Sequence, residues 1–366
     1  MECCYLVALL FFAALFLSIL LTFLVRDYAL THKILDIPNE RSSHTHVTPR
    51  GGGLGFVIII ILGLGVLFFQ PIIEINIAIT LIGGGFIVAI IGWWDDKNGL
   101  SPRIRSVFHF IAAVWALYWL GGFSNLDIGF MTVPLGSIGT IIAVIGIVWM
   151  INLYNFMDGI DGIAGTEAVS VLIIAGILVY MSGNMELACL CGFLAVSVAG
   201  FLVWNWPPAR IFMGDVGSGF LGFVFACLAI FSENAGAVPL IIWILLLGVF
   251  VIDATSTLIM RLCQGKKWYE AHRSHVYQLA VQVGFSHKQV TLTVLVINCG
   301  LGLIAYWIFM VRDLLLPVSL ITAVLLIFLS IYLRKRFMIK IERLSIKPNH
   351  EVKRGLVEAA AHNDKE

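Results

Sequence analysis

Long apolar runs recur along almost the whole chain and constrain its fold more than any other feature. The run from Ile138 to Ile151, for example, contains no charged residue. Because the hydrocarbon core of a bilayer is about 30 Å thick and an α-helix rises about 1.5 Å per residue, about 20 apolar residues are enough to span it. The sequence therefore predicts an integral membrane protein built from transmembrane α-helices.

The number of such runs defines the predicted fold class, and the composition agrees with it. The chain has 366 residues, of which 60% are hydrophobic and 12% are charged, whereas soluble proteins average about 25% charged residues. The predicted fold is an all-α polytopic bundle of about 11 transmembrane helices. The expected spans are residues 5–25, 53–70, 77–94, 106–122, 136–153, 163–181, 186–204, 217–232, 237–258, 290–311 and 314–333.

The two ends of the chain complete the predicted organisation. The first span has no basic residue before it and no small-residue cleavage pattern after it, so we expect it to be retained rather than removed as a signal peptide. Residues 1–333 are predicted to form one multi-pass membrane domain. Residues 334–366 are predicted to form a basic tail, which suits either anionic membrane lipids or the ordinary flank of a last span.

Positive charge is distributed unevenly between the two ends of the predicted spans. With an odd number of spans and the N-terminus outside, every Lys and Arg except Arg312 falls on one side. Lys and Arg accumulate in cytoplasmic loops. The sequence therefore predicts a periplasmic N-terminus and a cytoplasmic C-terminus.

Acidic residues gather at the predicted cytoplasmic ends of four spans. They are Asp95 and Asp96 in GWWDDKNGLSPRIR, Asp158 and Asp161 in NLYNFMDGIDGIAG, Asp215 in FMGDVGSGF and Asp253 in VIDATSTLIMR. Carboxylates are costly at membrane depth and usually functional there, and clustered carboxylates need a cation among them. Mg²⁺ prefers oxygen ligands and substrate phosphates, so it is the predicted cofactor, with Mn²⁺ as the alternative metal.

Each acidic motif also has a structural alternative. Asp95 and Asp96 could be the solvated end of a span, and Asp215 could cap the helix that follows it. Asp253 could pair with Arg261 or with another helix rather than bind a ligand. Because adjacent residues point about 100° apart on a helix, we expect Asp95 and Asp96 to differ, one facing metal and the other a proton.

The stretch NLYNFMDGIDGIAG places polar side chains at regular intervals. Asn152, Asn155, Asp158 and Asp161 are three residues apart. Such positions are neighbours on a helix, but the stripe drifts by about 60° per step, so these side chains can line a curving wall. Their donors and acceptors match the edges of nucleobases, which favours a nucleotide pocket over a simple polar helix cap. The aromatic residues of WNWPPARIF could stack on the base.

Glycines accompany the same motifs. They form GGG after HVTPR, flank the carboxylates of MDGIDGIAG and surround the Asp of GDVGSG. Glycine lets the backbone approach a ligand closely, and a helix N-terminus after such a turn attracts anions. Close packing between transmembrane helices is the alternative reason for these glycines.

The loop RLCQGKKWYEAHRSHVYQ adds a set of basic groups to the same side. Its Lys266, Lys267, His272, Arg273 and His275 could clamp a diphosphate, mainly through Arg273 and His275. The alternative is that a basic loop is simply what a cytoplasmic position requires.

Taken together, five motifs resemble those of the polyprenyl-phosphate N-acetylhexosamine-1-phosphate transferases. DIPNERSSHTHVTPRGGG, DDKNGLSPRIR, NLYNFMDGIDGIAG, FMGDVGSG and HRSHVYQ occur in this order between the predicted spans, over roughly residues 30–290. The resemblance implies an enzyme that transfers an N-acetylated sugar 1-phosphate from a UDP-sugar to undecaprenyl phosphate and releases UMP. It also implies a bacterial inner membrane location with the active site facing the cytoplasm, and no nucleic-acid partner.

The resemblance also implies roles for individual residues. Asp95 is expected to accept a proton from the lipid phosphate or to position it. The catalytic candidates are Asp95, Asp96, Asp158 and Asp161; the metal candidates are Asp215, Asp96 and Asp158; and the substrate-binding candidates are Asn155, Gly159, Ile160, Phe212, Arg273, His275, His44 and Arg50. A one-step displacement and a route through an aspartyl intermediate both fit these carboxylates, and the sequence also leaves open whether the chain forms a homodimer.

The last motif departs from part of the family. Relatives that use UDP-N-acetylglucosamine commonly carry further histidines after the Arg-x-His of this loop, where this chain has Tyr277 and Gln278. The pattern resembles more closely the enzymes that begin O-antigen with 6-deoxy N-acetylated sugars. The alternatives are a UDP-N-acetylglucosamine-using transferase for enterobacterial-type glycan, teichoic acid or peptidoglycan, a transporter or flippase for anionic solutes, and a scaffolding subunit.

Overall fold

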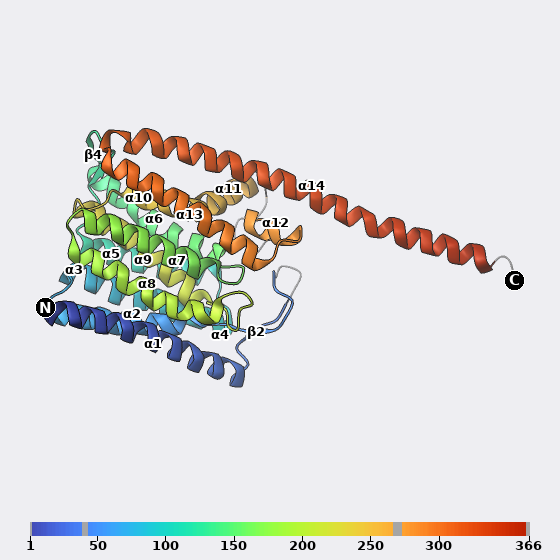
Figure 1. Ribbon diagram of the computed structural model, residues 1–366, viewed down its shortest axis with the longest axis horizontal. Helices are drawn as coiled ribbons and strands as arrows, with labels where there is room; N and C mark the ends of the chain where they lie inside the picture. Colours follow the sequence, from blue (N-terminus) through green and yellow to red (C-terminus); the bar gives the residue numbers. More distant parts are fainter. Residues whose placement is uncertain (1, 39–42, 266–272, 364–366) are drawn as a thin grey trace.

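Helices make up nearly all the regular structure of the chain (Figure 1). The computed structural model describes residues 2–38, 43–265 and 273–363, with side chains described between residues 5 and 344 outside these gaps. The helices are α1 (Glu2–Thr31), α2 (Gly53–Phe69), α3 (Ile75–Ile79), α4 (Gly85–Asn98), α5 (Pro102–Leu120), α6 (Gly136–Met157), α7 (Ile163–Met181), α8 (Met185–Asn205), α9 (Asp215–Asn234), α10 (Leu240–Leu246), α11 (Gly248–Cys263), α12 (Val276–Gln282), α13 (His287–Met310) and α14 (Leu315–Asn363).

The all-α membrane class predicted from the sequence is confirmed. Helix covers most of each of the predicted spans. Among the described residues, eight helices are long and apolar enough to cross a membrane, or up to nine if the bent pair α10–α11 counts as one span. The predicted total of about 11 additionally includes α2, which has 17 residues, and α5, which lies outside that set.

One predicted span differs from the straight helix that we expect at residues 237–258. The chain bends by 80° between α10 and α11, at Leu247 and Gly248. Sharp bends of this kind are typical of glycine positions, where no side chain resists the change of direction. The predicted span at residues 77–94 is also irregular in its first half, because a π-helical turn, Thr80–Gly84, joins α3 to α4.

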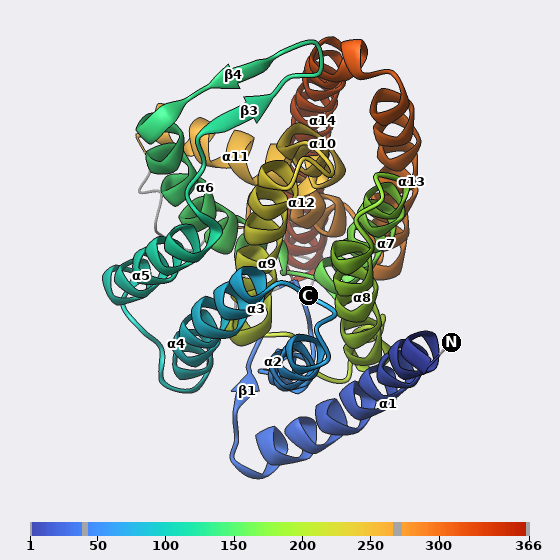
Figure 2. The ribbon, with the colours of Figure 1, turned by 90° about the vertical axis from the view of Figure 1, so that its left-hand side faces the viewer.

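The interior of the bundle is built around α9. In an apolar stretch of 18 residues of α9, 83% of the stretch is buried inside the bundle. The corresponding share for α1, at the edge of the bundle, is 17%. Figure 2 shows α9 among the helices that surround it, with α1 on the outside. Glycines permit this packing, because a Cβ on Gly53 of α2 would lie 2.4 Å from the Cα of Gly217 of α9. The interpretation that such glycines serve helix packing is therefore correct for this pair.

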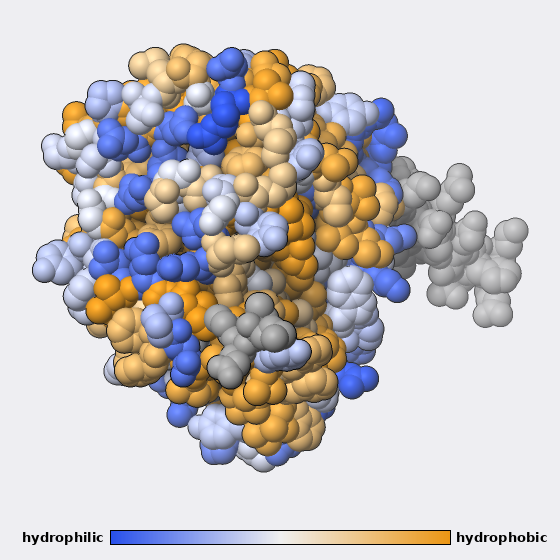
Figure 3. All heavy atoms as spheres, turned by 60° about the vertical axis from the view of Figure 1, so that its left-hand side comes forward, coloured by the Kyte–Doolittle hydropathy of each residue, from blue (hydrophilic) through white to orange (hydrophobic). Residues whose placement is uncertain are grey.

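Much of the outer surface is apolar. Figure 3 shows broad hydrophobic areas on the surface of the molecule, and large apolar side chains such as Tyr5, Leu62, Tyr118, Val296 and Phe328 are more than 60% exposed. Exposed apolar area of this extent would be unfavourable in water and is suited to contact with lipid.

Short strands and a long helix complete the fold. β1 (Leu35–Asp36) pairs with β2 (Thr48–Pro49), and β3 (Asn125–Asp127) pairs with β4 (Thr132–Pro134), both antiparallel. These two ladders lie at opposite ends of the bundle, and the β1–β2 end also carries α12 and the end of α4 (Figure 1). We call it the α12 end. Helix α14 continues past residue 334, the expected start of the tail, and projects beyond the bundle at this end.

Candidate active site

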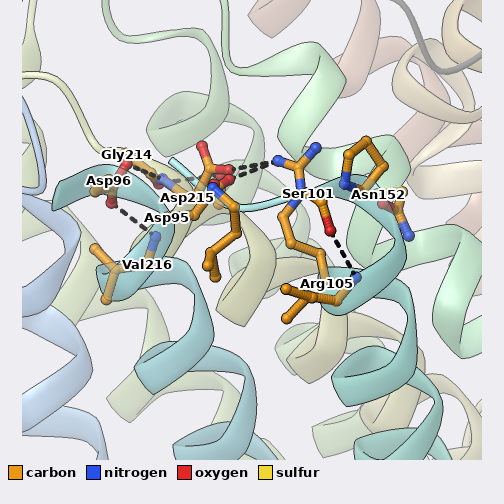
Figure 4. Close-up of polar contacts among 12 residues, drawn as sticks. Asp95, Asp96, Ser101, Arg105, Asn152, Gly214, Asp215 and Val216 are labelled. Carbon is orange, nitrogen blue, oxygen red and sulfur yellow. Dashed lines mark hydrogen bonds and ion pairs between the residues drawn. The ribbon is translucent and has the colours of Figure 1, made fainter. Parts of the chain in front are cut away.

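Asp95 and Asp96 lie in the last turn of α4, at the α12 end of the bundle. Their carboxylates face different surroundings, as their separation around the helix predicts. Asp95 accepts hydrogen bonds from the Leu100 backbone N–H and from Arg105 of α5, the latter at 2.6 Å. Asp96 instead points to the first residues of α9 (Figure 4).

Asp96 caps α9. Its Oδ1 accepts the backbone N–H of Asp215 at 2.9 Å, and its Oδ2 accepts that of Val216 at 3.1 Å. The residue is 8% exposed. The capping geometry requires glycine at position 214, because φ there is +76° and a Cβ would lie 2.4 Å from Asp96 Oδ2. Asp96 thus satisfies free N–H groups at the start of α9 and determines where Asp215 lies.

Two arginines connect the three carboxylates into one charged network. Arg105 Nη1 lies 2.6 Å from Asp95 Oδ2 and 3.1 Å from Asp215 Oδ2. Arg50 Nη2 lies 2.6 Å from Asp96 Oδ1 and 3.2 Å from Asp215 Oδ1. Figure 4 shows Arg105 reaching from α5 to this point. We call these five residues the acid–arginine network.

The position of Arg50 depends on backbone pairing between segments far apart in the sequence. The Phe212 N–H donates to Pro49 O at 2.8 Å, and the Gly52 N–H donates to Phe212 O at 2.9 Å. Burial lowers the pKa of Arg50, but Asp96 and Asp215 raise it by more, so its pKa lies above the ordinary value. Arg50 therefore stays positively charged.

Asp158 lies just after α6 and near the network. Burial, followed by the negative charges of Asp215 and Asp96, raises the pKa of Asp158 well above its ordinary value. Within the part of the chain that the structure describes, its carboxylate makes no hydrogen bond or ion pair. It is thus an unpaired carboxyl group beside an acidic cluster.

A small cavity adjoins the network. Its volume is about 60 Å³, and Asn152, Asn155, Phe156, Arg105 and Asp215 contribute to its lining. Asn152 is held by α6 and α5, since its Nδ2 donates to Val148 O at 2.7 Å and lies 3.3 Å from His109 Nδ1. Asn152 and Asn155 thus both line this cavity, in keeping with the curving wall predicted from the sequence, and Asn152 is in addition bound to the scaffold.

The second carboxylate of the same motif, Asp161, has a different environment from that of Asp158. Its Oδ2 accepts the Ala209 backbone N–H at 3.0 Å, and its Oδ1 lies 3.1 Å from His287 Nδ1. Burial raises the pKa of Asp161, but the contacts with His287 and Ala209 lower it by more, so that the net shift is downward. Both carboxylate oxygens of Asp161 are thus engaged by protein groups.

Two further residues of this motif are placed by packing. Ile160 is 5% exposed and belongs to the hydrophobic core, so any substrate contact there would come from its backbone. Gly159 is exposed, and a Cβ there would lie 2.2 Å from the Tyr277 hydroxyl oxygen. That hydroxyl donates to Phe156 O at 2.9 Å, which holds α12 against the end of α6.

The last loop is positioned by Asp253. The Val276 N–H donates to Asp253 Oδ1 at 3.0 Å, and His275 Nδ1 lies 3.7 Å from the same oxygen. Arg334 of α14 also contacts Asp253 Oδ1, at 3.4 Å. The alternative that Asp253 pairs with another helix is therefore correct. His275 is 3% exposed and turned toward Asp253, so it lies inside the fold.

The remaining predicted substrate contacts lie in the first and last loops of the α12 end. The His44 ring meets the edge of Phe212, with 4.9 Å between ring centroids. Burial lowers the pKa of Arg273, whose backbone oxygen accepts a hydrogen bond from Gln282. Lys266, Lys267 and His272 lie outside the described residues.

Two groups in the site lack a clear sequence signal. Arg105 is part of the motif DDKNGLSPRIR, but nothing in its spacing distinguishes it from Arg103 as a partner for Asp95 and Asp215. His287 lies far from every acidic motif in the sequence. Pairing across 110 and 126 residues is visible only in the folded chain.

The fold and site together define a class: a multi-pass helical membrane protein with clustered carboxylates and arginines at one end of its bundle. Comparisons agree. Residues 78–233 match the model of glycosyl transferase family 4. An undecaprenyl-phosphate alpha-N-acetylglucosaminyl 1-phosphate transferase of Haemophilus influenzae is 30% identical over 293 residues, covering 76% of this chain and 81% of the relative. A probable enzyme of the same kind from Bacillus subtilis is 28% identical over 298 residues, covering 79% and 81%.

An undecaprenyl-phosphate alpha-N-acetylglucosaminyl 1-phosphate transferase of Salmonella typhimurium is 25% identical over 329 residues, covering 86% of this chain and 87% of the relative. This chain belongs to the polyprenyl-phosphate N-acetylhexosamine-1-phosphate transferases of glycosyl transferase family 4. It is an enzyme of the glycosyl-phosphate transferase type, as the sequence motifs predict.

Proposed function

We propose that the enzyme transfers an N-acetylated sugar 1-phosphate from a UDP-sugar to undecaprenyl phosphate, with release of UMP, to begin the synthesis of O-antigen or another cell-surface glycan. The acid–arginine network is the observation that carries this proposal. Phosphoryl transfer depends mainly on positioning anions and neutralising the charge that develops on them. Arg50 and Arg105 supply that charge from two different segments, beside carboxylates that can hold a metal ion or a proton.

Mg²⁺ is the proposed cofactor, and the donor set fits it. Among the described residues, no three His, Cys, Asp or Glu side chains are arranged to hold a metal ion by themselves. Mg²⁺ does not need such an arrangement, since it usually keeps several waters and binds one or two carboxylates together with substrate phosphate. Asp215 and the unpaired Asp158 would supply those carboxylates. When bound, the metal would neutralise charge on the diphosphate.

The protein residues then have distinct parts in the reaction. An oxygen of the lipid phosphate attacks the β-phosphorus of the UDP-sugar, and the bond from that phosphorus to the oxygen of UMP breaks. Asp95 accepts the proton of the lipid phosphate or orients its anion. Arg50 and Arg105 move from carboxylate to phosphate oxygens, for which the guanidinium fork is equally suited. Asp96 keeps α4 and α9 in place.

The acceptor's isoprenoid tail requires an apolar binding site close to the membrane. A groove of about 310 Å³ lies between α11, α12, α13 and α14, beyond the bend that follows α10. Its lining is mostly apolar and includes Val249, Val294 and Leu326. Tyr277 lines the same groove and contacts the end of α6, so the groove reaches the segment that carries Asp158. We assign the tail to this groove.

We place the site at the cytoplasmic face of a bacterial inner membrane. The support is the distribution of charge: all lysines and arginines except Arg312 lie on the predicted cytoplasmic side. Arg50 and Arg105 belong to this set and form part of the network itself. A cytoplasmic site is also where a UDP-sugar is available.

The donor sugar has two candidates, each with its own support. The names of the three relatives favour N-acetylglucosamine. Tyr277 and Gln278 favour a 6-deoxy N-acetylated sugar, because they stand where family members that use UDP-N-acetylglucosamine carry histidines. Both side chains form hydrogen bonds with the backbone of the bundle. The Tyr277 hydroxyl donates to Phe156 O, and Gln278 Oε1 accepts the His275 N–H at 3.3 Å.

A donor panel tests the proposed reaction. The purified protein in detergent, supplied with undecaprenyl phosphate, is assayed for UMP release with UDP-N-acetylglucosamine, UDP-N-acetylfucosamine, UDP-N-acetylquinovosamine and UDP-glucose, with Mg²⁺ or with EDTA. We expect Mg²⁺-dependent UMP from one N-acetylated donor and at least tenfold less from UDP-glucose, a difference of about 1.4 kcal/mol. Absence of UMP with every donor would contradict the proposal and favour transport or scaffolding.

A further inference from the structure

His287, the first residue of α13, lies between two oxygen atoms. Its Nδ1 is 3.1 Å from Asp161 Oδ1, and its Nε2 is 3.1 Å from the Ser43 carbonyl oxygen. A longer hydrogen bond, which the Asp161 backbone N–H donates to Nδ1 at 3.4 Å, instead requires an Nδ1 without a proton. A neutral imidazole has one N–H, whereas a carboxylate and a carbonyl oxygen can only accept. The two short contacts together favour the doubly protonated imidazolium, because a ring with one proton can donate to only one of the two oxygens.

The contacts of Asp161 make this pair a junction between segments. Its second oxygen accepts the Ala209 N–H at 3.0 Å, and its backbone oxygen accepts the Thr291 hydroxyl at 2.9 Å. The side chains of His287 and Asp161 are only 16% and 12% exposed. Water therefore competes weakly for their hydrogen bonds, and the ion pair is stronger than one at an open surface.

Three segments that carry the candidate site meet at this pair. Ser43 precedes His44 and Arg50, Asp161 follows Asp158, and Ala209 precedes Phe212 and Asp215. Since His287 contacts the first two directly and the third through Asp161, it can fix the spacing between them without touching the network itself.

The neighbouring helix does not supply this cation. Tyr277 and Gln278 of α12 stand where the histidines of UDP-N-acetylglucosamine-using family members are expected, and both bond to the scaffold. The imidazole that meets the DGIDG motif instead comes from the start of α13. Other basic groups near the pair are His44 and Arg273, which act on it at longer range.

We infer that His287 is a positioning residue for the transfer reaction. As an imidazolium it holds Asp161 and the Ser43 carbonyl, and it thereby keeps Asp158 and Arg50 at the spacing that the acid–arginine network needs. The expected effect of His287 on kcat rests on the proposed function. The charge state and the contacts of His287 stand independently of it.

The test compares His287→Gln with Lys288→Gln in the full-length protein. Lys288 is exposed and adjacent on the same helix, so its variant removes a like charge without the contacts of His287. We expect His287→Gln to lower kcat between about 10- and 100-fold, as misplaced reacting groups do, while KM for the UDP-sugar changes less than threefold. Lys288→Gln is expected to keep kcat within about twofold of the unmodified enzyme. Equal kcat values for the two variants would overturn the inference.

A second comparison covers the case in which His287→Gln folds poorly. Asp161→Asn breaks the pair from the other side, and the double variant should be no slower than the slower single variant, because both remove one interaction. Multiplying effects would contradict the inference. In addition, ¹⁵N-histidine spectra should show protons on both ring nitrogens of His287, and a neutral tautomer at neutral pH would contradict it. If the unmodified enzyme releases no UMP, the proposed function fails while the spectra still decide the charge state.

Discussion

At the scale of single residues, adjacent carboxylates have different environments. Asp95 is bound by Arg105 and by one backbone N–H, while Asp96 is used almost entirely to cap α9 and to bind Arg50. The expectation that the two residues differ follows from helix geometry. What Asp96 contacts could not be predicted, because a cap supplied by a different helix leaves no local pattern in the sequence.

This capping role predicts that Asp96 matters for stability. Asp96→Ala leaves two backbone N–H groups of α9 without their acceptor and leaves Arg50 with Asp215 as its remaining carboxylate partner in the network. A buried unsatisfied group costs about 1–3 kcal/mol. We expect a lower midpoint of thermal unfolding in detergent for Asp96→Ala than for Asp313→Ala, whose side chain is exposed at the opposite end. An unchanged midpoint for Asp96→Ala would contradict the capping role.

The sequence identifies the acidic residues of the site better than their partners. The gathering of Asp95, Asp96 and Asp215 at one end of the bundle is predicted from span boundaries alone, because all three lie at the same side of the membrane in that assignment. Arg105 and His287 require knowledge of which loops meet. For Ile160, the resemblance marks a substrate contact, but the side chain lies in the core, which a motif cannot show.

At the scale of helices, apolar length predicts position well and internal geometry poorly. Hydropathy averages over a whole span, so it does not detect the 80° bend between α10 and α11 or the π-helical turn before α4. The short β1–β2 ladder is likewise missed, because two residues per strand are too few to produce a periodic pattern. The β1–β2 ladder leads into Arg50 of the network, and the bend between α10 and α11 adjoins the apolar groove.

Polar contacts inside the bundle give a prediction for α7 and α13. Asn298 Nδ2 donates to Glu167 Oε2 at 2.6 Å and to Ser170 Oγ at 2.9 Å, and Glu167 and Asn298 are both nearly completely buried. Interhelical hydrogen bonds in membranes contribute about 0.6–2 kcal/mol. We expect Asn298→Ala to destabilise the protein by this amount, measured by thermal unfolding in detergent.

Two further variants define that interaction. Glu167→Gln keeps an oxygen acceptor for Asn298 and is expected to be much less destabilising than Glu167→Ala. Cys299→Ala changes an exposed neighbour on the same helix and should leave the unfolding midpoint unchanged. If Asn298→Ala and Cys299→Ala behave alike, the α7–α13 hydrogen bonds do not contribute to stability.

At the scale of the whole molecule, the bundle gathers its charged network at one end. Membrane orientation then decides which substrates can reach the network. The distribution of basic residues supports the proposal that the α12 end faces the cytoplasm, and the opposite end contains Asp313. We predict that Asp313→Cys in a cysteine-free variant is labelled by a membrane-impermeant maleimide in spheroplasts. Lys97→Cys in the same background should be labelled only after the membrane is permeabilised. The reverse pattern would contradict the proposed orientation.

The overall architecture and the family are the features most completely predicted from the sequence. Eleven apolar runs and five ordered motifs suffice for both, because membrane thickness and motif order are properties of the chain itself. The donor sugar is different, since we propose that it depends on a few contacts around residues 275–278, which motif order does not define. Those contacts are formed by packing between α6, α11, α12 and α14.

The most direct test of the central claim is UMP release by Asp95→Asn and Asp215→Asn. Both variants keep the size of the side chain but remove a charge from the acid–arginine network. With Mg²⁺, undecaprenyl phosphate and the preferred donor, we predict a loss of at least about 100-fold in kcat for each, equivalent to about 2.7 kcal/mol. Asp313→Asn should retain full activity. Near-normal turnover by folded Asp95→Asn or Asp215→Asn protein would contradict the assignment of this network as the reacting centre.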